Sequence, residues 1–199
     1  MDFEPYEGYF WQGEKIRLRP MQIEDAAQKL REYTDSEARA WLQLGIELPP
    51  VSLEKYTDQI KSYCNFQDTV QNTLFSIETL AGEYVGWINL HSQNFRRGTF
   101  GFGISIFREH RKNGYAEEAV RILLRYGFFE LRMQKCNSAC IAINEGSIRL
   151  HQKLGFKQEG RIRRNIYLHG EFHDDLLWGL LREEFADNEK QLDPTSGQW

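Results

Sequence analysis

The chain has 199 residues, of which 41% are hydrophobic and 27% charged, and its formal net charge is −4 at pH 7. This size and composition suit one globular domain over residues 1–199. The negative charge argues against a general nucleic-acid binder, and no run approaches the roughly 20 apolar residues that a membrane-spanning helix needs.

The first half of the chain predicts one strand followed by helices. Ile16 and Leu18 alternate with charged residues, which indicates a half-buried strand that Pro20 ends. Apolar residues at helical spacing then predict three helices, over 22–34, from Ser36 as N-cap to Gly45, and over 52–66.

The second half predicts most of a sheet. Three strands over 72–80, 84–91 and 99–107 form an antiparallel meander, and a long helix over 116–131, a strand over 136–143 and a helix from Asn144 to Gly155 follow. Two strands around a turn at 169–171 and a closing helical turn complete a core over about 14–185, and we expect the polar tail 187–199 to be loose. The strand–helix–strand unit implies a parallel crossover, so the predicted fold class is α+β, with a mixed, mostly antiparallel central sheet and flanking helices.

A cluster of cations stands directly before the long helix, at Arg108, His110, Arg111 and Lys112. Basic residues usually favour the other end of a helix, where the dipole is negative. The first N–H groups of a helix lack internal partners, and Gly114 lets an anion approach them closely, so this corner suits a phosphate or pyrophosphate. The Walker A and dinucleotide-binding patterns are absent. The alternative is a strand-to-helix turn with a solvated basic face.

Arg111, Gly114 and Ala116 match the pattern Q/R-x-x-G-x-G/A, which resembles the acyl-CoA pyrophosphate loop of the GNAT superfamily of N-acetyltransferases. The segments "IRLRPMQIEDA", "YVGWINL", "NEGSIRLHQKLGFKQEGRIR" and "HGEFHDDLLWGLLREEF" are similar, in this order, to segments of the branch that contains ribosomal-protein N-terminal (alanine/serine) acetyltransferases. The resemblance covers roughly residues 14–185. It implies a GNAT-like fold and acetyl-CoA as cosubstrate.

The resemblance also implies which residues bind acetyl-CoA. In this family the loop N–H groups wrap the pyrophosphate, and the strand before the loop splays away from the next parallel strand to offer its backbone to the pantetheine arm. An asparagine and a serine after the following strand hold the pantetheine amide and lie near the thioester sulfur, although Asn144 is equally a natural N-cap. The implied binding residues are Ile104, Ser105, Ile106, Arg111, Lys112, Asn113, Gly114, Tyr115, Ala116, Asn144 and Ser147.

Acetyl transfer to an amine requires a group that takes the amine proton and donors for the oxyanion, which the strand at 104–106 can supply. By the resemblance, Ser147 protonates the leaving thiolate or only hydrogen-bonds to it. Related proteins often carry a glutamate ahead of the glycine–aromatic pair, where this chain has Thr99 and Phe100. Asp174 matches the family aspartate and is the next candidate base, or else it ties the strand turn. Asp175, Glu145 and Tyr167 are further candidates.

We therefore expect an acyltransferase that moves an acetyl group from acetyl-CoA to a peptide N-terminus, a polyamine or another small amine, in a ternary complex. The alternatives are a catalytically weak CoA-binding module with a regulatory role and an unrelated phosphate-binding regulator. The three cysteines show no metal spacing, so no metal is expected. We also expect no nucleic-acid or membrane partner, a monomer or homodimer, and a cytoplasmic location, because the acidic, aromatic N-terminus does not look like a signal peptide.

Overall fold

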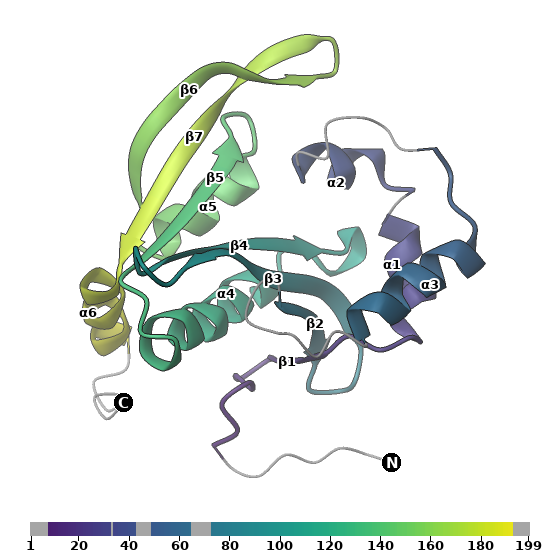
Figure 1. The fold of residues 1–199 in the computed structure, drawn as a ribbon, viewed down its shortest axis with the longest axis horizontal. Coiled ribbons are helices and arrows are strands. Elements are labelled where there is room, and N and C mark those ends of the chain that lie inside the picture. The colour runs from purple at the N-terminus through teal and green to yellow at the C-terminus, as the bar shows by residue number, and fades with distance from the viewer. Residues whose placement is uncertain (1–7, 33, 43–48, 65–72, 193–199) are drawn as a thin grey trace.

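The computed structural model describes residues 8–32, 34–42, 49–64 and 73–192, which contain a seven-stranded sheet with the strand order β1-β2-β3-β4-β5-β7-β6 (Figure 1). Neighbouring strands are antiparallel except β4 and β5, which run parallel. The strands are β1 (Ile16–Pro20), β2 (Thr73–Thr79), β3 (Tyr84–Asn94), β4 (Thr99–Ile106), β5 (Lys135–Ile141), β6 (Lys157–Leu168) and β7 (Glu171–Leu181).

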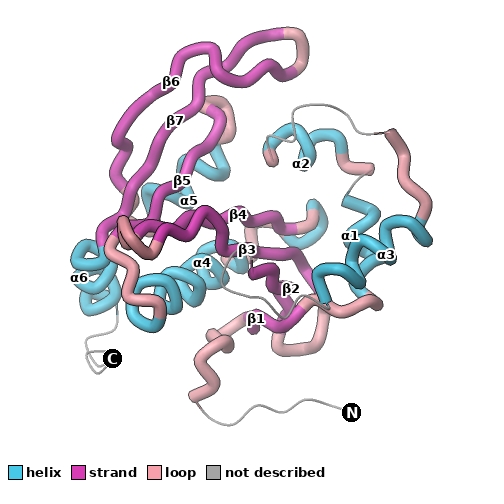
Figure 2. Tube along the Cα trace, in the orientation of Figure 1, coloured by secondary structure: helices cyan, strands magenta, loops and turns pink. Residues whose placement is uncertain are grey.

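Helices connect and flank these strands (Figure 2). They are α1 (Asp25–Glu32), α2 (Ser36–Trp41), α3 (Leu53–Cys64), the 3₁₀-helix η1 (Arg108–His110), α4 (Tyr115–Arg125), the π-helical turn η2 (Tyr126–Glu130), α5 (Glu145–Lys153) and α6 (Arg182–Leu192). None of the helices in the described ranges is long and apolar enough to span a membrane.

The core lies on both faces of the sheet. Helix α4 turns Ala119, Val120 and Leu123 toward a main cluster that contains the inward side chains of β1, β3 and β4. Alternate residues of a strand point to opposite faces, so Trp87 of β3 packs on the other face, in a smaller cluster with Tyr56 of α3 and residues of α1. One face of β4 is therefore covered by α4, and the opposite face of its neighbour β3 is covered by α1 and α3.

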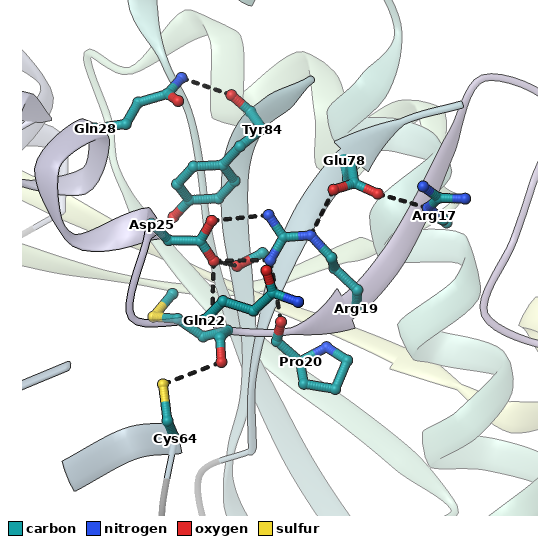
Figure 3. Close-up of polar contacts among 11 residues, drawn as sticks. Arg17, Arg19, Pro20, Gln22, Asp25, Gln28, Cys64, Glu78 and Tyr84 are labelled. Atoms are coloured by element: carbon teal, nitrogen blue, oxygen red, sulfur yellow. Dashed lines mark hydrogen bonds and ion pairs between the residues drawn. The ribbon is translucent and has the colours of Figure 1, made fainter. Parts of the chain in front are cut away.

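A buried ionic network fixes the start of α1 on the sheet (Figure 3). Asp25 is 5% exposed and accepts two hydrogen bonds from Arg19, both at 2.8 Å, and one from Ser76 Oγ at 2.8 Å. Arg19 also donates to Glu78 at 2.6 Å. Burial alone would raise the pKa of Asp25, but the hydrogen bonds from Arg19, from the Gln22 N–H and from Ser76 hold it below its ordinary value. These contacts thus tie strands β1 and β2 to helix α1.

The structure confirms the α+β class, the order of the elements and the single parallel crossover. It differs at several element ends, three of which are the following. Asp35, and not Ser36, is the N-cap of α2, where its side chain accepts from Ala38 N at 3.1 Å. The long helix ends at Arg125 and continues as a π-turn, in which Leu131 N donates to Tyr126 O. The segment 187–192, expected to be loose, belongs to α6. Gly45, residues 65–66 and the rest of the tail lie outside the described residues.

Candidate functional site

Strands β4 and β5 separate after a short paired stretch and leave a gap between them. They pair only at Thr99–Lys135, Phe100–Cys136 and Gly101–Asn137, whereas β4 continues to Ile106 and β5 to Ile141. Figure 1 shows the two strands diverging toward their carboxyl ends. We call the Gly101–Asn137 level the vertex of the gap. Beyond the vertex, backbone groups of β4 lack a strand partner and can hold an extended ligand as an added strand would.

The backbone of β4 presents alternate residues to this gap. Phe107 N donates to Val85 O on β3 at 3.0 Å, and Gly103 N donates to Asn89 Oδ1 on β3 at 2.9 Å. Because successive residues of a strand point to opposite neighbours, the backbone groups of Ile104 and Ile106 point into the gap, while those of Ser105 point toward β3. This differs from the sequence expectation, in which all three backbones faced the ligand. The Ile106 carbonyl oxygen already accepts a bond from Arg111 Nε at 3.1 Å.

The loop after β4 ends at the N-terminus of α4. Gly114 is the N-cap with a φ of 85°, and Lys112 also has a positive φ, of 67°. Within the helix, Glu118 N donates to Gly114 O at 3.3 Å, so the N–H groups of Tyr115 and Ala116 precede the first intrahelical bond. Such N–H groups, together with loop residues of alternating handedness, form a concave site for an anion.

The side chains of this loop mostly turn away from the N-terminus of α4. Arg111 lies 3.7 Å from Asp35, in addition to its bond with Ile106 O, and the Asn113 amide donates to His110 O at 3.0 Å. Lys112 is exposed. Lys15 Nζ, from the segment before β1, donates to Asn113 O at 3.3 Å. The loop therefore offers its backbone N–H groups to an anion. Two cationic side chains accompany it: Lys112 belongs to the loop, and Lys15 contacts it at Asn113 O.

A cavity of about 470 Å³ lies between the end of β4 and helices α1 and α2. Arg108 crosses its rim, pairing with Asp35 at 2.6 Å and with Glu37 at 2.9 Å. The hydrogen bond from Arg108 is the main reason that the pKa of Asp35 lies below its ordinary value. Asp35 therefore both caps α2 and, through its pair with Arg108, holds α2 beside η1. The lining includes Glu32 and Ile106, so the cavity lies next to the gap.

Glu32 is a buried carboxylate that the sequence did not single out. It is 8% exposed, accepts a bond from Trp87 Nε1 at 2.6 Å and accepts another from the Ser105 hydroxyl. Lys29 Nζ lies 3.8 Å from Glu32 and 4.0 Å from the centre of the Trp87 ring. Burial lowers the pKa of Lys29 to about 8, against the opposing effect of Glu32. Both Glu32 oxygens accept hydrogen bonds, so this carboxylate ties α1 to β3 through Trp87 and to β4 through Ser105.

Helix α5 begins where β5 ends. Asn144 is its N-cap, and Asn144 Oδ1 accepts from Ser147 N at 3.0 Å. Ser147 Oγ lies 3.4 Å from His151 Nδ1. Burial raises the pKa of Cys140, and hydrogen bonds with Trp178 and Ser147 oppose this rise. His151 is only 2% exposed, so its ring lies in the core and not at the surface. The structure brings Asn144 and Ser147 to the same end of the sheet as Gly114, because α4 and α5 both follow the carboxyl ends of parallel strands.

Asp174 lies on β7 away from the vertex. It accepts a bond from Arg164 N at 2.8 Å and pairs with Arg161 at 2.5 Å. These contacts, the backbone bond first, lower the pKa of Asp174 below its ordinary value. A carboxylate with a low pKa and a guanidinium partner is a weak proton acceptor. The geometry favours the role of a tie across the β6–β7 hairpin.

These features can be compared with known proteins. A family model described as an acetyltransferase (GNAT) domain matches residues 15–157. The chain belongs to the GNAT acetyltransferase family. This GNAT protein is 30% identical over 179 residues to the SPbeta prophage-derived uncharacterized N-acetyltransferase YokL of Bacillus subtilis, covering 90% of this chain and 97% of the relative. It is 23% identical to the spermidine N(1)-acetyltransferase of Escherichia coli over 175 residues, 88% of this chain and 90% of that one.

Solved structures show the same fold. Spermidine N-acetyltransferase from Vibrio cholerae, solved with CoA and spermine, matches with a TM-score of 0.75 at 18% identity and covers 86% of this chain and 98% of that one. The GNAT family assignment makes this protein an acyltransferase of the N-acetyltransferase type, and GNAT acetyltransferases use acetyl-CoA. The recognition of the superfamily from its loop pattern is confirmed.

The GNAT site contains residues that sequence reasoning missed. Glu32 sits at a polar position of an amphipathic helix, and its partner Ser105 is 73 residues away, so no local signal links the two. His91 occupies an ordinary alternation on β3, and only the strand register places it opposite Gly101 at the vertex. Asp35 precedes a serine that is an equally good cap by type, and the choice between them depends on Arg108.

Proposed function

We propose that this protein transfers the acetyl group of acetyl-CoA to a primary amine by direct attack in a ternary complex. The observation that supports it most is the gap between β4 and β5, whose open end meets the N-terminus of α4 at Gly114. The gap suits an extended arm, and the N-terminus suits the pyrophosphate to which such an arm is attached. The relatives named for spermidine support a small cationic amine as the acceptor.

The residues present fit this ligand. At Gly114 a side chain would project toward Lys15 Nζ, 3.1 Å from an added Cβ, and so into the space where an anion would meet the loop. The N–H groups of 112–116 would hold the pyrophosphate, and the carbonyl oxygen of Ile104 would hold the pantetheine arm. The bound thioester would supply an activated acyl group. The Ile104 N–H, directed into the gap, is the donor placed to stabilise the oxyanion.

The remaining groups have separate tasks. The hydroxyl of Ser147 stands at the β5 side of the gap, where it can donate to the leaving sulfur. Asn144 is committed by its side chain to capping α5, so its contribution to a ligand would come from that helix end as a whole. No cysteine is required for direct attack, and Cys136 and Cys140 are buried.

A catalytically weak CoA-binding module is the second candidate, because β4 carries no acidic side chain from Thr99 to Ile106. Two measurements separate the candidates. Titration calorimetry with acetyl-CoA should show saturable binding, and the absence of binding at millimolar ligand would overturn both. Release of free thiol in the presence of peptide N-termini, polyamines and aminoglycosides should then identify an acceptor. Binding with no thiol release for any amine would favour the module.

A further inference from the structure

His91 stands at the vertex of the gap, on the face of the sheet opposite α4. It lies across from Gly101, and Gly101 is the last residue of β4 that pairs with β5. A Cβ added to Gly101 would lie 2.8 Å from His91 Cε1 and 3.1 Å from Asn137 O. The imidazole therefore covers the backbone of β4 at the point where the strands separate, and a glycine is needed beneath it.

An irregularity in β3 follows His91 directly. The register between β3 and β4 shifts between His91 and Asn94, and Ser92 has a φ of 53°. Such irregularities bend a strand and often lie next to active sites. Ser92 Oγ is 2.9 Å from His91 Nδ1, so the residue that bends the strand also orients the ring. The ring is only partly buried, which leaves it accessible from this face.

The surroundings of His91 keep the ring neutral. Its neighbours on β3 and β4 are Asn89, Ser92 and Gly101, none of them charged. On the same face of β5 and β6, Lys135 and Glu159 pair with each other at 2.7 Å. Burial lowers the pKa of His91 below its ordinary 6.5, and a hydrogen bond with the Phe102 backbone opposes this only in part. A neutral imidazole at pH 7 can accept a proton.

Three other titratable groups near the gap are engaged in contacts of their own. Asp174 is paired with Arg161, and both oxygens of Glu32 accept hydrogen bonds. His151 is enclosed, with its ring 5.3 Å from that of Trp178 and 5.9 Å from that of Phe102. His91, on the neighbouring strand β3 and over Gly101, can take the role of the acidic residue that β4 lacks.

We infer that His91 is the general base of this enzyme, an inference that rests on the proposed acetyl transfer. The amine nitrogen forms the new bond to the carbonyl carbon, and as it gains positive charge it gives a proton to the imidazole of His91. The carbon–sulfur bond breaks, its electron pair stays on sulfur, and the thiolate takes a proton either from water or from Ser147, which then regains one from solvent. The imidazolium then releases its proton to solvent. An amide and a free thiol are the products.

The test compares His91→Asn with His169→Asn, the same substitution at an exposed histidine in the β6–β7 turn, where asparagine tolerates the positive φ of 52°. Acetyl-CoA affinity by calorimetry serves as the check on folding. With an accepted amine, turnover of His91→Asn should fall by about 100-fold at unchanged acetyl-CoA affinity, while His169→Asn should match the wild type. His91→Ala should regain part of its turnover on addition of free imidazole.

The pH profile gives a second, independent readout. In the wild type, kcat/KM calculated on the unprotonated amine should fall as pH drops below 6.5, because the base becomes protonated, and His91→Asn should lack this fall. Turnover of His91→Asn within about threefold of the wild type, or an unchanged acid limb, would overturn the inference while leaving acetyl transfer intact. A wild-type protein that releases no thiol with any amine would instead overturn the proposed function and this inference together.

Discussion

At Gly114 the backbone has a φ of 85°, and the side chain of any other residue would project toward Lys15, beside the loop that precedes α4. Gly114→Val should therefore weaken acetyl-CoA binding by at least about tenfold, measured by calorimetry. Gly82→Val is the matched control, since Gly82 has a φ of 87° and no atom within 4 Å of an added Cβ. Both variants should lose similar stability, because left-handed backbone costs any β-branched residue roughly 1–2 kcal/mol. Equal affinity in the two variants would contradict a backbone cradle at Gly114.

Asp174 supports a second prediction at this scale. Its carboxylate is held by Arg161 and by the Arg164 N–H, and its pKa lies below the ordinary value, so it is already ionised throughout the neutral range. Asp174→Asn should keep turnover within about threefold of the wild type, whereas loss of a general base costs about 100-fold or more. Steady-state rates between pH 6 and 8 check this. A 100-fold loss with an altered acid limb would make Asp174 the base and displace His91.

At the scale of elements, substitutions of Asn144 distinguish a role in capping α5 from a role in binding the ligand. Its side chain accepts from Ser147 N at 3.0 Å, which satisfies one free donor of α5 and fixes the first turn of that helix. Asn144→Ala should cost about 1 kcal/mol of unfolding free energy in urea, and Asn144→Asp, which can cap equally well, should cost little. A direct ligand contact by the amide would instead make Asn144→Asp lose acetyl-CoA affinity at unchanged stability.

Local patterns were enough to predict most elements, and contacts distant in sequence decided the rest. Alternation of Ile16 and Leu18 predicted β1, and Asn144 was predicted as a cap because caps are chosen by neighbouring backbone groups. Asp35 displaced Ser36 as the cap of α2, and its partner Arg108 is 73 residues away. The backbone direction of Ser105 follows from strand register, which no single segment contains. For the same reason His91, whose setting depends on Gly101 and Asn137, carried no signal in the sequence.

At the scale of the whole molecule, the two halves of the sheet are joined by only three residue pairs between β4 and β5. His151 on α5 bridges them from below, because its ring stacks between Phe102 of β4 and Trp178 of β7. His151 Nε2 also lies 2.8 Å from Ser138 Oγ on β5. A buried imidazole and its aromatic neighbours therefore join β4 to β7 across the two halves of the sheet.

This bridge predicts how stability depends on pH. Burial lowers the pKa of His151 below its ordinary 6.5, so the unfolded chain takes up a proton first as pH falls. The stabilisation is complete above pH 6.5 and is lost progressively toward the lower folded pKa. The free energy of unfolding in urea should fall by on the order of 1 kcal/mol between pH 8 and pH 5. His151→Phe, which keeps an aromatic ring in the stack, should reduce this fall, with the part due to His91 remaining. An identical fall in both proteins would show that the proton is taken up elsewhere.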